Sequence, residues 1–225
     1  MLRENWLIVG ISGATCSGKT TVAKNIQSLF LDCVVIHQDD YFHDTSSEKH
    51  TKIPELNHIN FEILSSVDMD AMKNRIQSVL RSDNSLHDLE ERRTYLEEKF
   101  KEISRSSEIV PMNECLLNKM RNLKRIPNIL ILDGFLMFND DELHELCDLR
   151  FYFTIGKAEC WERRRVRTYD PPDVPGYFDK YVWPHYLIHY EEVLKKAGDI
   201  KYIDGGDSIE NNFKSVLHKL LTHLS

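Results

Sequence analysis

Short apolar runs alternate with longer amphipathic segments along this chain of 225 residues. The apolar runs are bounded by turn-forming residues and lie at Leu7–Ile11, Val34–His37, Ile129–Leu132, Arg150–Ile155 and Lys201–Ile203. Continuous apolar runs of this length are typical of parallel strands buried on both faces, and the segments between them have helical spacing. The pattern therefore predicts an α/β fold with a doubly wound parallel sheet. The length suits one domain spanning residues 1–225.

The segment from about 82 to 125 departs from this alternation. Its apolar residues are spaced as on one face of a helix, with charged residues between them, at Leu86, Leu89, Leu96, Phe100 and Ile103. We therefore predict a helical insertion that contains a charged amphipathic helix. Its apolar face either packs back on the domain or forms a dimer contact. The sequence does not choose between these alternatives, so a monomer and a homodimer both remain open.

The stretch from Gly13 to Thr20 fits G-x-x-x-x-G-K-[ST], the phosphate-binding loop of ATP- and GTP-dependent enzymes. A predicted strand precedes it and a predicted helix follows, so backbone N–H groups and the helix N-terminus can face phosphates. We expect Lys19 to reach the β- and γ-phosphates during catalysis and the Thr20 hydroxyl to bind Mg²⁺. The expected nucleotide-binding residues of this loop are Gly13, Ala14, Thr15, Cys16, Ser17, Gly18, Lys19, Thr20 and Thr21.

Acidic residues follow two other predicted strands, where the carboxyl ends of a parallel sheet form its ligand-binding edge. Asp39 comes directly after the second strand. Transfer of a phosphoryl group to a hydroxyl requires a carboxylate that aligns the hydroxyl and accepts its proton, and we assign this catalytic role to Asp39. Asp133 ends the third apolar run, in an arrangement that resembles a Walker B acid. The candidate Mg²⁺ ligands are therefore Thr20, Asp39 and Asp133.

A run of basic residues between Glu162 and Tyr169 leads into a proline-rich loop. Arg163 and Arg167 are four residues apart and are expected to share a helical face. Arg164 then points elsewhere, so one face would bind ATP phosphates and another the acceptor. We expect the prolines to end the helix and stiffen a flap. Because a phosphotransferase must keep water from its ATP, residues from about 160 to 180 are predicted to form a lid.

Composition and charge limit the possible binding partners and the cellular compartment of the protein. The 29 Lys and Arg residues against 36 Asp and Glu give a net charge of −7, which argues against nucleic acid or an anionic membrane as a partner. The 5 cysteines show no C-x-x-C spacing, and Cys16 lies within the phosphate loop, as expected in a reducing compartment. The first apolar run is too short to cross a bilayer, and no signal-peptide cleavage pattern follows it. We expect a cytoplasmic protein.

Five longer stretches of the sequence together form a recognisable pattern: Gly10–Thr21, Gln38–Phe42, Asp133–Asn139, Arg163–Asp179 and Val182–Pro184. They resemble the nicotinamide riboside kinases. Phosphate loops occur in many families, but the segment PPD-x-PGYFD-x-x-VWP is narrow in distribution. It separates this family from its uridine kinase relatives. The resemblance covers both ends and most of the middle of the chain and fails across roughly 82–125.

The resemblance implies a P-loop kinase fold and the Mg²⁺-dependent transfer of phosphate from ATP to the ribose 5′-hydroxyl of nicotinamide riboside. The product would be nicotinamide mononucleotide, for NAD synthesis. By position, Asp39 resembles the proton acceptor and Thr20 the magnesium ligand. The implied nucleotide-side residues beyond the phosphate loop are Arg163, Arg167, Thr168, Tyr169, Asp207, Ser208 and Ile209. The implied acceptor-side residues are Asp39, Asp40, Tyr41, Phe42, Phe61, Glu62, Arg164, Tyr169 and Asp170.

Two of these positions depart from the family. Glu62 stands where the family usually has Asp, and Asp133 where it usually has Glu, so each charge is displaced by a methylene group. The cationic pyridinium of nicotinamide riboside suits aromatic faces, and Phe42, Phe61, Tyr169 and Tyr177 are available.

The sequence also allows other functions. The acceptor could instead be uridine or cytidine, and nicotinic acid riboside could be a second substrate. A protein of another class, a nucleotide-dependent switch or scaffold without phosphoryl transfer, would also need the phosphate loop. Such a switch does not need an acid that aligns an acceptor, so Asp39 favours the enzyme.

Overall fold

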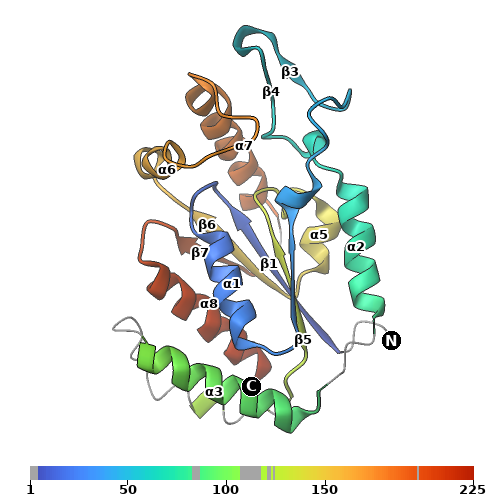
Figure 1. The fold of residues 1–225 in the computed structure, drawn as a ribbon, viewed down its shortest axis with the longest axis vertical. Coiled ribbons are helices and arrows are strands. Elements are labelled where there is room, and N and C mark those ends of the chain that lie inside the picture. The colour runs from blue at the N-terminus through green and yellow to red at the C-terminus, as the bar shows by residue number, and fades with distance from the viewer. Residues whose placement is uncertain (1–4, 83–86, 107–117, 121–122, 124, 197) are drawn as a thin grey trace.

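The computed structural model describes residues 5–225 except 83–86, 107–117, 121–122, 124 and 197. A five-stranded parallel sheet in the order β2-β5-β1-β6-β7 forms its centre, as Figure 1 shows. The strands are β1 (Trp6–Gly13), β2 (Cys33–His37), β5 (Asn128–Asp133), β6 (Leu149–Thr154) and β7 (Ile200–Asp204). Each of them overlaps one of the predicted apolar runs, and the α/β class with a doubly wound parallel sheet is confirmed.

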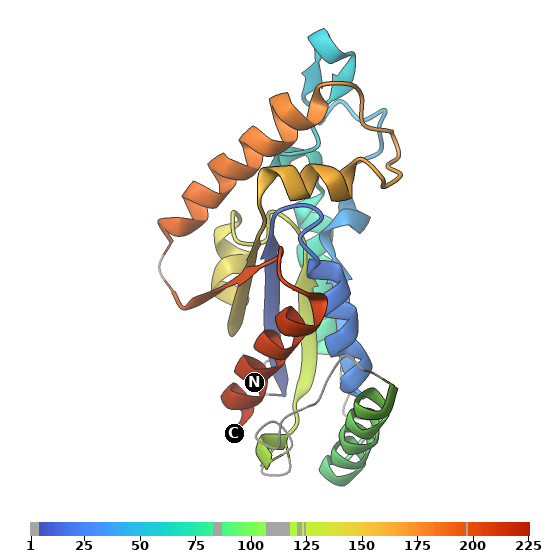
Figure 2. The ribbon, with the colours of Figure 1, turned by 90° about the vertical axis from the view of Figure 1, so that its left-hand side faces the viewer.

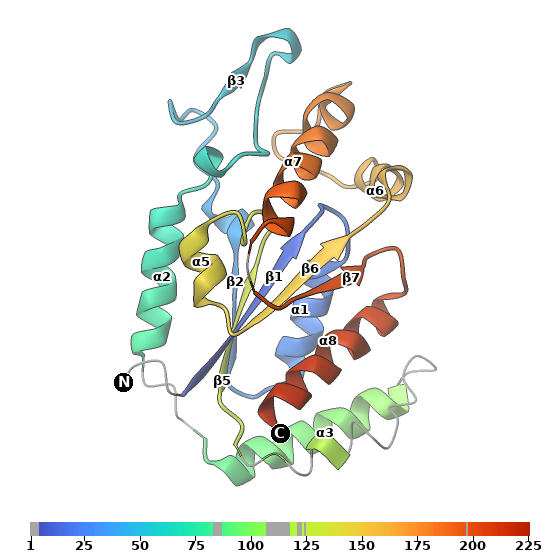
Figure 3. The same cartoon turned by 180° about the vertical axis from the view of Figure 1, so that it is seen from behind.

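Helices cover both faces of this sheet. The first face carries α1 (Lys19–Leu29), α3 (Leu89–Ser106) and α8 (Ile209–Leu224). The opposite face, turned to the viewer in Figure 3, carries α2 (Met69–Arg81), α5 (Asp141–Leu146) and α7 (Trp183–Leu194). The helix α6 (Lys157–Arg164) lies beside α7 at the end of the sheet where its strands terminate (Figure 1). In the described part of the chain, no helix has both the length and the apolar character needed to cross a bilayer.

The strands are apolar throughout because the two sheet faces each bury a separate core. Successive side chains of a strand point to opposite faces. In β1, Val9 and Ile11 contribute to the core under α1 and α8, whereas Trp6 and Ile8 contribute to the core under α2 and α5. Each of these four side chains is at most 7% exposed.

Several short elements lie at the carboxyl end of the sheet, around the candidate site. The 3₁₀ helices are η1 (Gln38–Tyr41), η2 (Pro54–Leu56) and η3 (Leu64–Ser66), and a π-helical turn, η4 (Phe178–Val182), leads into α7. A two-stranded antiparallel hairpin of β3 (Lys52–Ile53) and β4 (His58–Ile59) rises above this end, next to α7. Figures 1 and 2 place this hairpin, α6 and α7 at the end of the molecule opposite α3.

The charged helix α3 packs back on the domain, which is the first of the two alternatives for it. Leu96 and Phe100 are at most 1% exposed and join the core formed with α1 and α8. The buried guanidinium of Arg92 anchors the same helix, 2.9 Å from Asp32 and 2.7 Å from the carbonyl oxygen of Ile126. A dimer contact stays a hypothesis. So does the extent of the insertion, since much of 82–125, including the predicted helical residue Leu86, lies outside the described residues.

The burial of Phe100 predicts that the substitution Phe100→Ala destabilises the protein by about 3–5 kcal/mol, because it leaves a cavity in the core. Thr94→Ala, on the exposed side of α3, should change the free energy of unfolding by less than about 0.5 kcal/mol. Urea unfolding followed by circular dichroism measures both. Equal and small effects would show that α3 does not contribute to the core.

Candidate active site

The phosphate loop joins β1 to α1 through a sharp turn that glycine makes possible. Gly13 has a φ of 121°, and a Cβ atom at this position would overlap the carbonyl oxygen of Phe153 on the neighbouring strand. Gly18, with a φ of 93°, occupies the N-cap of α1 and has no side chain to cap the first turn. The backbone N–H groups of this turn are therefore available to an anion.

Lys19 is the buried cation of this loop, with 8% of its surface exposed. Its Nζ donates a hydrogen bond to the carbonyl oxygen of Ala14, which folds the side chain back over the loop. Burial lowers the pKa of Lys19, and the charges of Asp133 and Asp39 oppose this effect. Lys19 is thus near enough to Asp39 and Asp133, the two acids that the sequence singles out, for their charges to act on it.

Asp133 ends β5 and is the most enclosed acid of the site, with 3% of its surface exposed. One carboxylate oxygen, Oδ2, accepts a hydrogen bond from the Thr20 hydroxyl at 2.7 Å and lies 2.9 Å from Nδ1 of His37. The other oxygen, Oδ1, is buried without a hydrogen-bond partner among the described residues. Asp133 therefore joins α1, β2 and β5 and keeps one oxygen free for a ligand.

These oxygens fit a magnesium ion that binds together with phosphates. Within the described ranges, no cluster of three or more His, Cys, Asp or Glu side chains could hold a metal by itself. Mg²⁺ usually takes one or two carboxylates and completes its octahedron with water and substrate phosphate oxygens. The unpartnered Oδ1 of Asp133 and the Thr20 hydroxyl beside it supply donors of the right chemistry.

The neighbouring residue Gln38 anchors the backbone that carries Asp39. The side chain of Gln38 is fully buried, and its Oε1 accepts hydrogen bonds from the backbone N–H groups of Phe135 and Leu136 at 3.1 and 3.0 Å. This anchor leaves Asp39 facing the cavity. Asp39 is exposed to the cavity, and partial desolvation by the surrounding protein raises its pKa, while the charge of Lys19 opposes the rise. A carboxylate with a raised pKa is a stronger proton acceptor.

The end of the helix in the predicted lid differs from the prediction. Helix α6 ends at Arg164, so Arg163 and Arg167 do not share a helical face, and the helix stops well before Pro171. The carboxylate of Asp173 binds the Arg164 guanidinium through two contacts, at 2.6 and 2.9 Å. An ion pair therefore lies at the end of this helix, and the prolines follow later in the chain.

The lid arginines nevertheless meet the phosphate loop. Arg163 donates to the backbone carbonyl oxygens of Cys16 and Gly205 at 3.2 and 2.8 Å. The Tyr169 ring lies 4.4 Å from the Arg164 guanidinium carbon and 5.4 Å from that of Arg167. The Tyr169 hydroxyl is 3.5 Å from the Cys16 sulfur. Residues of the predicted lid therefore contact the phosphate loop in this structure.

The predicted acceptor residues include an acid and an aromatic pair. The rings of Phe42 and Phe61 meet edge to face with centroids 5.6 Å apart. Glu62 is 9% exposed, with its Oε1 3.3 Å from the Tyr177 hydroxyl and 3.7 Å from Nη2 of Arg164. Burial raises the pKa of Glu62, and the charge of Arg164 opposes the rise. Arg164 thus connects the lid to the acceptor side.

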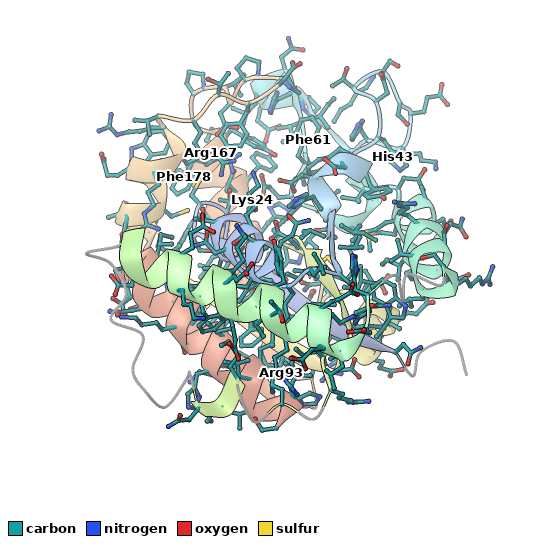
Figure 4. All side chains as sticks on the ribbon, turned by 60° about the horizontal axis from the view of Figure 1, so that its bottom comes forward. Lys24, His43, Phe61, Arg93, Arg167 and Phe178 are labelled. Atoms are coloured by element: carbon teal, nitrogen blue, oxygen red, sulfur yellow. The ribbon has the colours of Figure 1, made fainter. Side chains whose placement is uncertain are left out.

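Donor and acceptor sides share one cavity of about 980 Å³. Figure 4 shows three of its lining residues, Lys24, Phe61 and Arg167, which come from distant parts of the chain. Among the predicted site residues, those that line the cavity are Thr15, Cys16, Ser17, Gly18, Lys19, Thr20, Thr21, Asp39, Asp40, Phe42, Phe61, Glu62, Asp133, Arg163, Arg164, Arg167, Thr168, Tyr169, Asp170 and Ile209.

The remaining predicted residues lie outside the lining. Gly13 and Ala14 are buried beneath the loop, and Tyr41 packs, partly buried, against the core under α2. Asp207 and Ser208 take part in local bonds at the start of α8, where the Ser208 hydroxyl caps the helix. Ile209 alone of that turn reaches the cavity.

Several lining residues were not predicted as site residues. These residues are Lys24, His37, His43, Thr45, Gly134, Phe135, Pro171 and Asp173, and Tyr177 was named only as an available aromatic face. A sequence signal existed for some of them. His37 and Gly134 flank acids that follow strands, and Asp173 and Tyr177 belong to the proline-rich motif of the lid. His43 and Thr45 lie in an irregular loop and had no such signal.

A phosphate loop after the central strand, with an acid ending the strand beside it, defines a P-loop nucleotide-binding protein. A family model described as "Phosphoribulokinase / Uridine kinase family" matches residues 8–170, which is most of the chain, and the protein belongs to this family. It is a kinase, with ATP as the phosphate donor.

Curated relatives match nearly the full length. The chain is 34% identical to human nicotinamide riboside kinase 1, over 97% of this chain and 94% of that protein. It is 32% identical to human nicotinamide riboside kinase 2, over 97% of this chain and 82% of that protein. A more distant relative is the nicotinamide riboside kinase of Schizosaccharomyces pombe, at 28% identity over 86% of this chain and 83% of that protein.

The turn geometry predicts that Gly13→Ala weakens nucleotide binding by roughly tenfold or more, because the added Cβ displaces the loop from Phe153. Gly156→Ala is the matched control, since a Cβ there meets no atom within 4 Å. Isothermal titration of each variant with ADP and Mg²⁺ measures the dissociation constants. A Gly13→Ala protein that binds ADP as tightly as the control would contradict this account of the loop.

Proposed function

We propose that this kinase transfers the γ-phosphoryl group of ATP to the ribose 5′-hydroxyl of nicotinamide riboside and forms nicotinamide mononucleotide for NAD synthesis. The observation that carries the proposal is a single cavity that joins the phosphate loop, Asp39 and the Phe61–Glu62 pair. The names of the curated relatives support this acceptor. Nicotinic acid riboside, which has the same ribose, is a candidate second acceptor.

The donor side of the cavity holds the nucleotide. ATP supplies the phosphoryl group, and a bound Mg²⁺ would neutralise charge on its phosphate oxygens. Lys19 and the backbone N–H groups of the phosphate loop bind the phosphates. Thr20, Asp133 and Asp39 would hold the Mg²⁺ that binds together with ATP. Further nucleotide contacts are assigned to Arg163, Arg167, Thr168 and Tyr169 from the lid and to Asp207, Ser208 and Ile209 from the turn before α8.

Asp39 acts on the acceptor hydroxyl. Its carboxylate aligns the hydroxyl and takes its proton as the new P–O bond forms, so the leaving ADP needs no proton from the protein. The closed lid keeps water from competing as the acceptor. The contacts between the lid and the phosphate loop, through Arg163 and Tyr169, support this role.

The remaining groups orient the riboside. The aromatic faces of Phe42 and Phe61 suit a flat pyridinium cation. Glu62 and Arg164 supply an acceptor and donors for the ribose hydroxyls. Asp40, Tyr41 and Asp170 are assigned to the same side.

A riboside panel tests the proposal. Purified protein with ATP and Mg²⁺ should convert nicotinamide riboside to its mononucleotide, followed by chromatography and ³¹P NMR. Uridine and cytidine should be poor acceptors. Phosphorylation of these pyrimidine nucleosides without turnover of nicotinamide riboside would overturn the assigned substrate. Nucleotide-dependent association with another protein, without turnover of any riboside, would instead support the switch or scaffold.

Asp39→Ala should lower kcat by roughly 10²–10⁴-fold, because the acceptor hydroxyl loses its proton acceptor. The dissociation constant for ADP should stay close to that of the wild type, since the phosphate loop is unchanged. Asp44→Asn, an exposed acid a few residues further on and outside the cavity lining, is the control and should retain activity. Near-normal turnover by Asp39→Ala would show that Asp39 is not the base.

The raised pKa of Glu62 predicts a pH dependence of riboside binding. The ionised carboxylate accepts hydrogen bonds from the ribose, so KM for the riboside should rise as the pH falls through a pKa above the usual glutamate range. Glu62→Gln should have a high KM at every pH and should lose this acidic limb. Initial rates between about pH 5 and 8 measure both profiles. Identical acidic limbs in the two proteins would assign the titration to another group.

A further inference from the structure

The acceptor segment Asn60–Glu62 belongs to no helix or strand. Its backbone is held mainly by side chains from elsewhere in the chain. The Phe61 N–H donates to the Tyr177 hydroxyl at 2.9 Å, and the Glu62 carbonyl oxygen accepts from Nε2 of His189 at 2.7 Å. Buried backbone groups need partners, so these side chains replace the bonds that a regular element would supply.

Tyr177 serves two residues of this segment at once. Its hydroxyl accepts the hydrogen bond from Phe61 N–H and donates its own proton to Oε1 of Glu62, 3.3 Å away. The side chain is 1% exposed, and the ring of His58 meets it edge to face at a centroid distance of 4.7 Å. A buried, doubly bonded phenol fixes both the backbone of Phe61 and the carboxylate of Glu62.

Helix α7 holds the other side of the segment. His189 uses Nε2–H to bind the Glu62 carbonyl oxygen. One turn earlier, Nε2 of His185 lies 3.2 Å from Nδ2 of Asn60, and the Oδ1 of that amide accepts from Glu62 N–H at 3.0 Å. The direction of each bond follows, because Nδ1–H of His185 donates to the Tyr181 carbonyl oxygen at 2.8 Å and leaves Nε2 as an acceptor.

The donor side depends on a different set of bonds. The phosphate loop is fixed by the bond from Ala14 N–H to the Phe153 carbonyl oxygen at 2.9 Å and by the Ser17 hydroxyl on the Ala14 carbonyl oxygen at 2.7 Å. Neither Tyr177 nor His189 has a hydrogen bond to this loop among the described contacts. Loosening the acceptor segment should therefore leave nucleotide binding intact.

We propose that Tyr177 and His189 are positioning residues for the acceptor riboside. They act through Phe61 and Glu62, whose ring and carboxylate they hold at the acceptor end of the cavity. The inference rests on the proposed function, because it takes this end of the cavity as the riboside site. His189 does not line the cavity, so its effect on the acceptor is indirect.

Tyr177→Phe tests the first residue and keeps its ring in the core. It leaves the Phe61 N–H without its acceptor and Glu62 without a donor, so KM for the riboside should rise roughly tenfold or more. KM for ATP should not change. Tyr181→Phe is the matched control, because it removes a hydroxyl from the same segment that binds Glu55 on the β3–β4 hairpin, outside the cavity lining. Its two KM values should equal those of the wild type.

His189→Leu and His189→Gln test the second residue. Leu removes the donor and should raise KM for the riboside, whereas the amide N–H of Gln can donate to the Glu62 carbonyl oxygen and should restore much of the affinity. Thermal unfolding of all variants shows whether they remain folded. Unchanged riboside KM values in Tyr177→Phe and His189→Leu would overturn the inference. Equal increases in both KM values, or no rescue by Gln, would also overturn it by showing a general structural effect.

The same experiment separates the inference from the proposed function. The KM comparison is made with whichever nucleoside of the panel the wild type phosphorylates best. If that acceptor is uridine, the proposed substrate is wrong and the positioning role is still decided by the variants. If the wild type phosphorylates none of the panel, both the proposed function and the positioning role are rejected.

Discussion

The carboxylate of Asp133 is the interaction on which the site depends. Its Oδ2 accepts a hydrogen bond from the Thr20 hydroxyl of α1 and lies beside Nδ1 of His37 in β2. A single buried oxygen of β5 therefore connects α1, the helix after the phosphate loop, to β2 and β5. The register of the parallel sheet brings His37 to Asp133, because the two residues lie opposite each other on β2 and β5. Ile11 of β1 lies opposite Asp133 on the other side. A buried charge is stable only with such partners, and its free oxygen remains for a cation.

Around this centre, the cavity is built from two largely independent networks. The donor side is a tight turn fixed by backbone contacts to β6, where the absence of side chains at Gly13 and Gly18 matters most. The acceptor side is an irregular segment held by side chains of η4 and α7. Arg164 touches both, through the Tyr169 ring and through Asp173 and Glu62. Arg164 therefore connects the segment after α6 to Glu62.

Local patterns predicted the sheet well, because buried parallel strands are apolar on both faces, as Trp6–Gly13 is. They also located the phosphate loop and the acids at the strand ends. They failed where a distant contact decides the conformation. Helical spacing placed Arg163 and Arg167 on one face, yet the helix ends at Arg164, beside its ion pair with Asp173. The acceptor-side role of Tyr41, which the family resemblance implied, stays a prediction, and the structure shows this residue partly buried against the core under α2.

The sequence by itself determined the order of strands and helices, the phosphate loop and the acids that face it, because each of these has a signal within a few consecutive residues. Only the tertiary structure decided which oxygen of Asp133 stays free, where α6 ends and which side chains hold the acceptor segment. Tyr177 and His189 reach Phe61 and Glu62 across 116 and 127 residues of sequence. A single hydrogen bond between residues so far apart leaves no periodic pattern in the sequence, so only the folded structure reveals it.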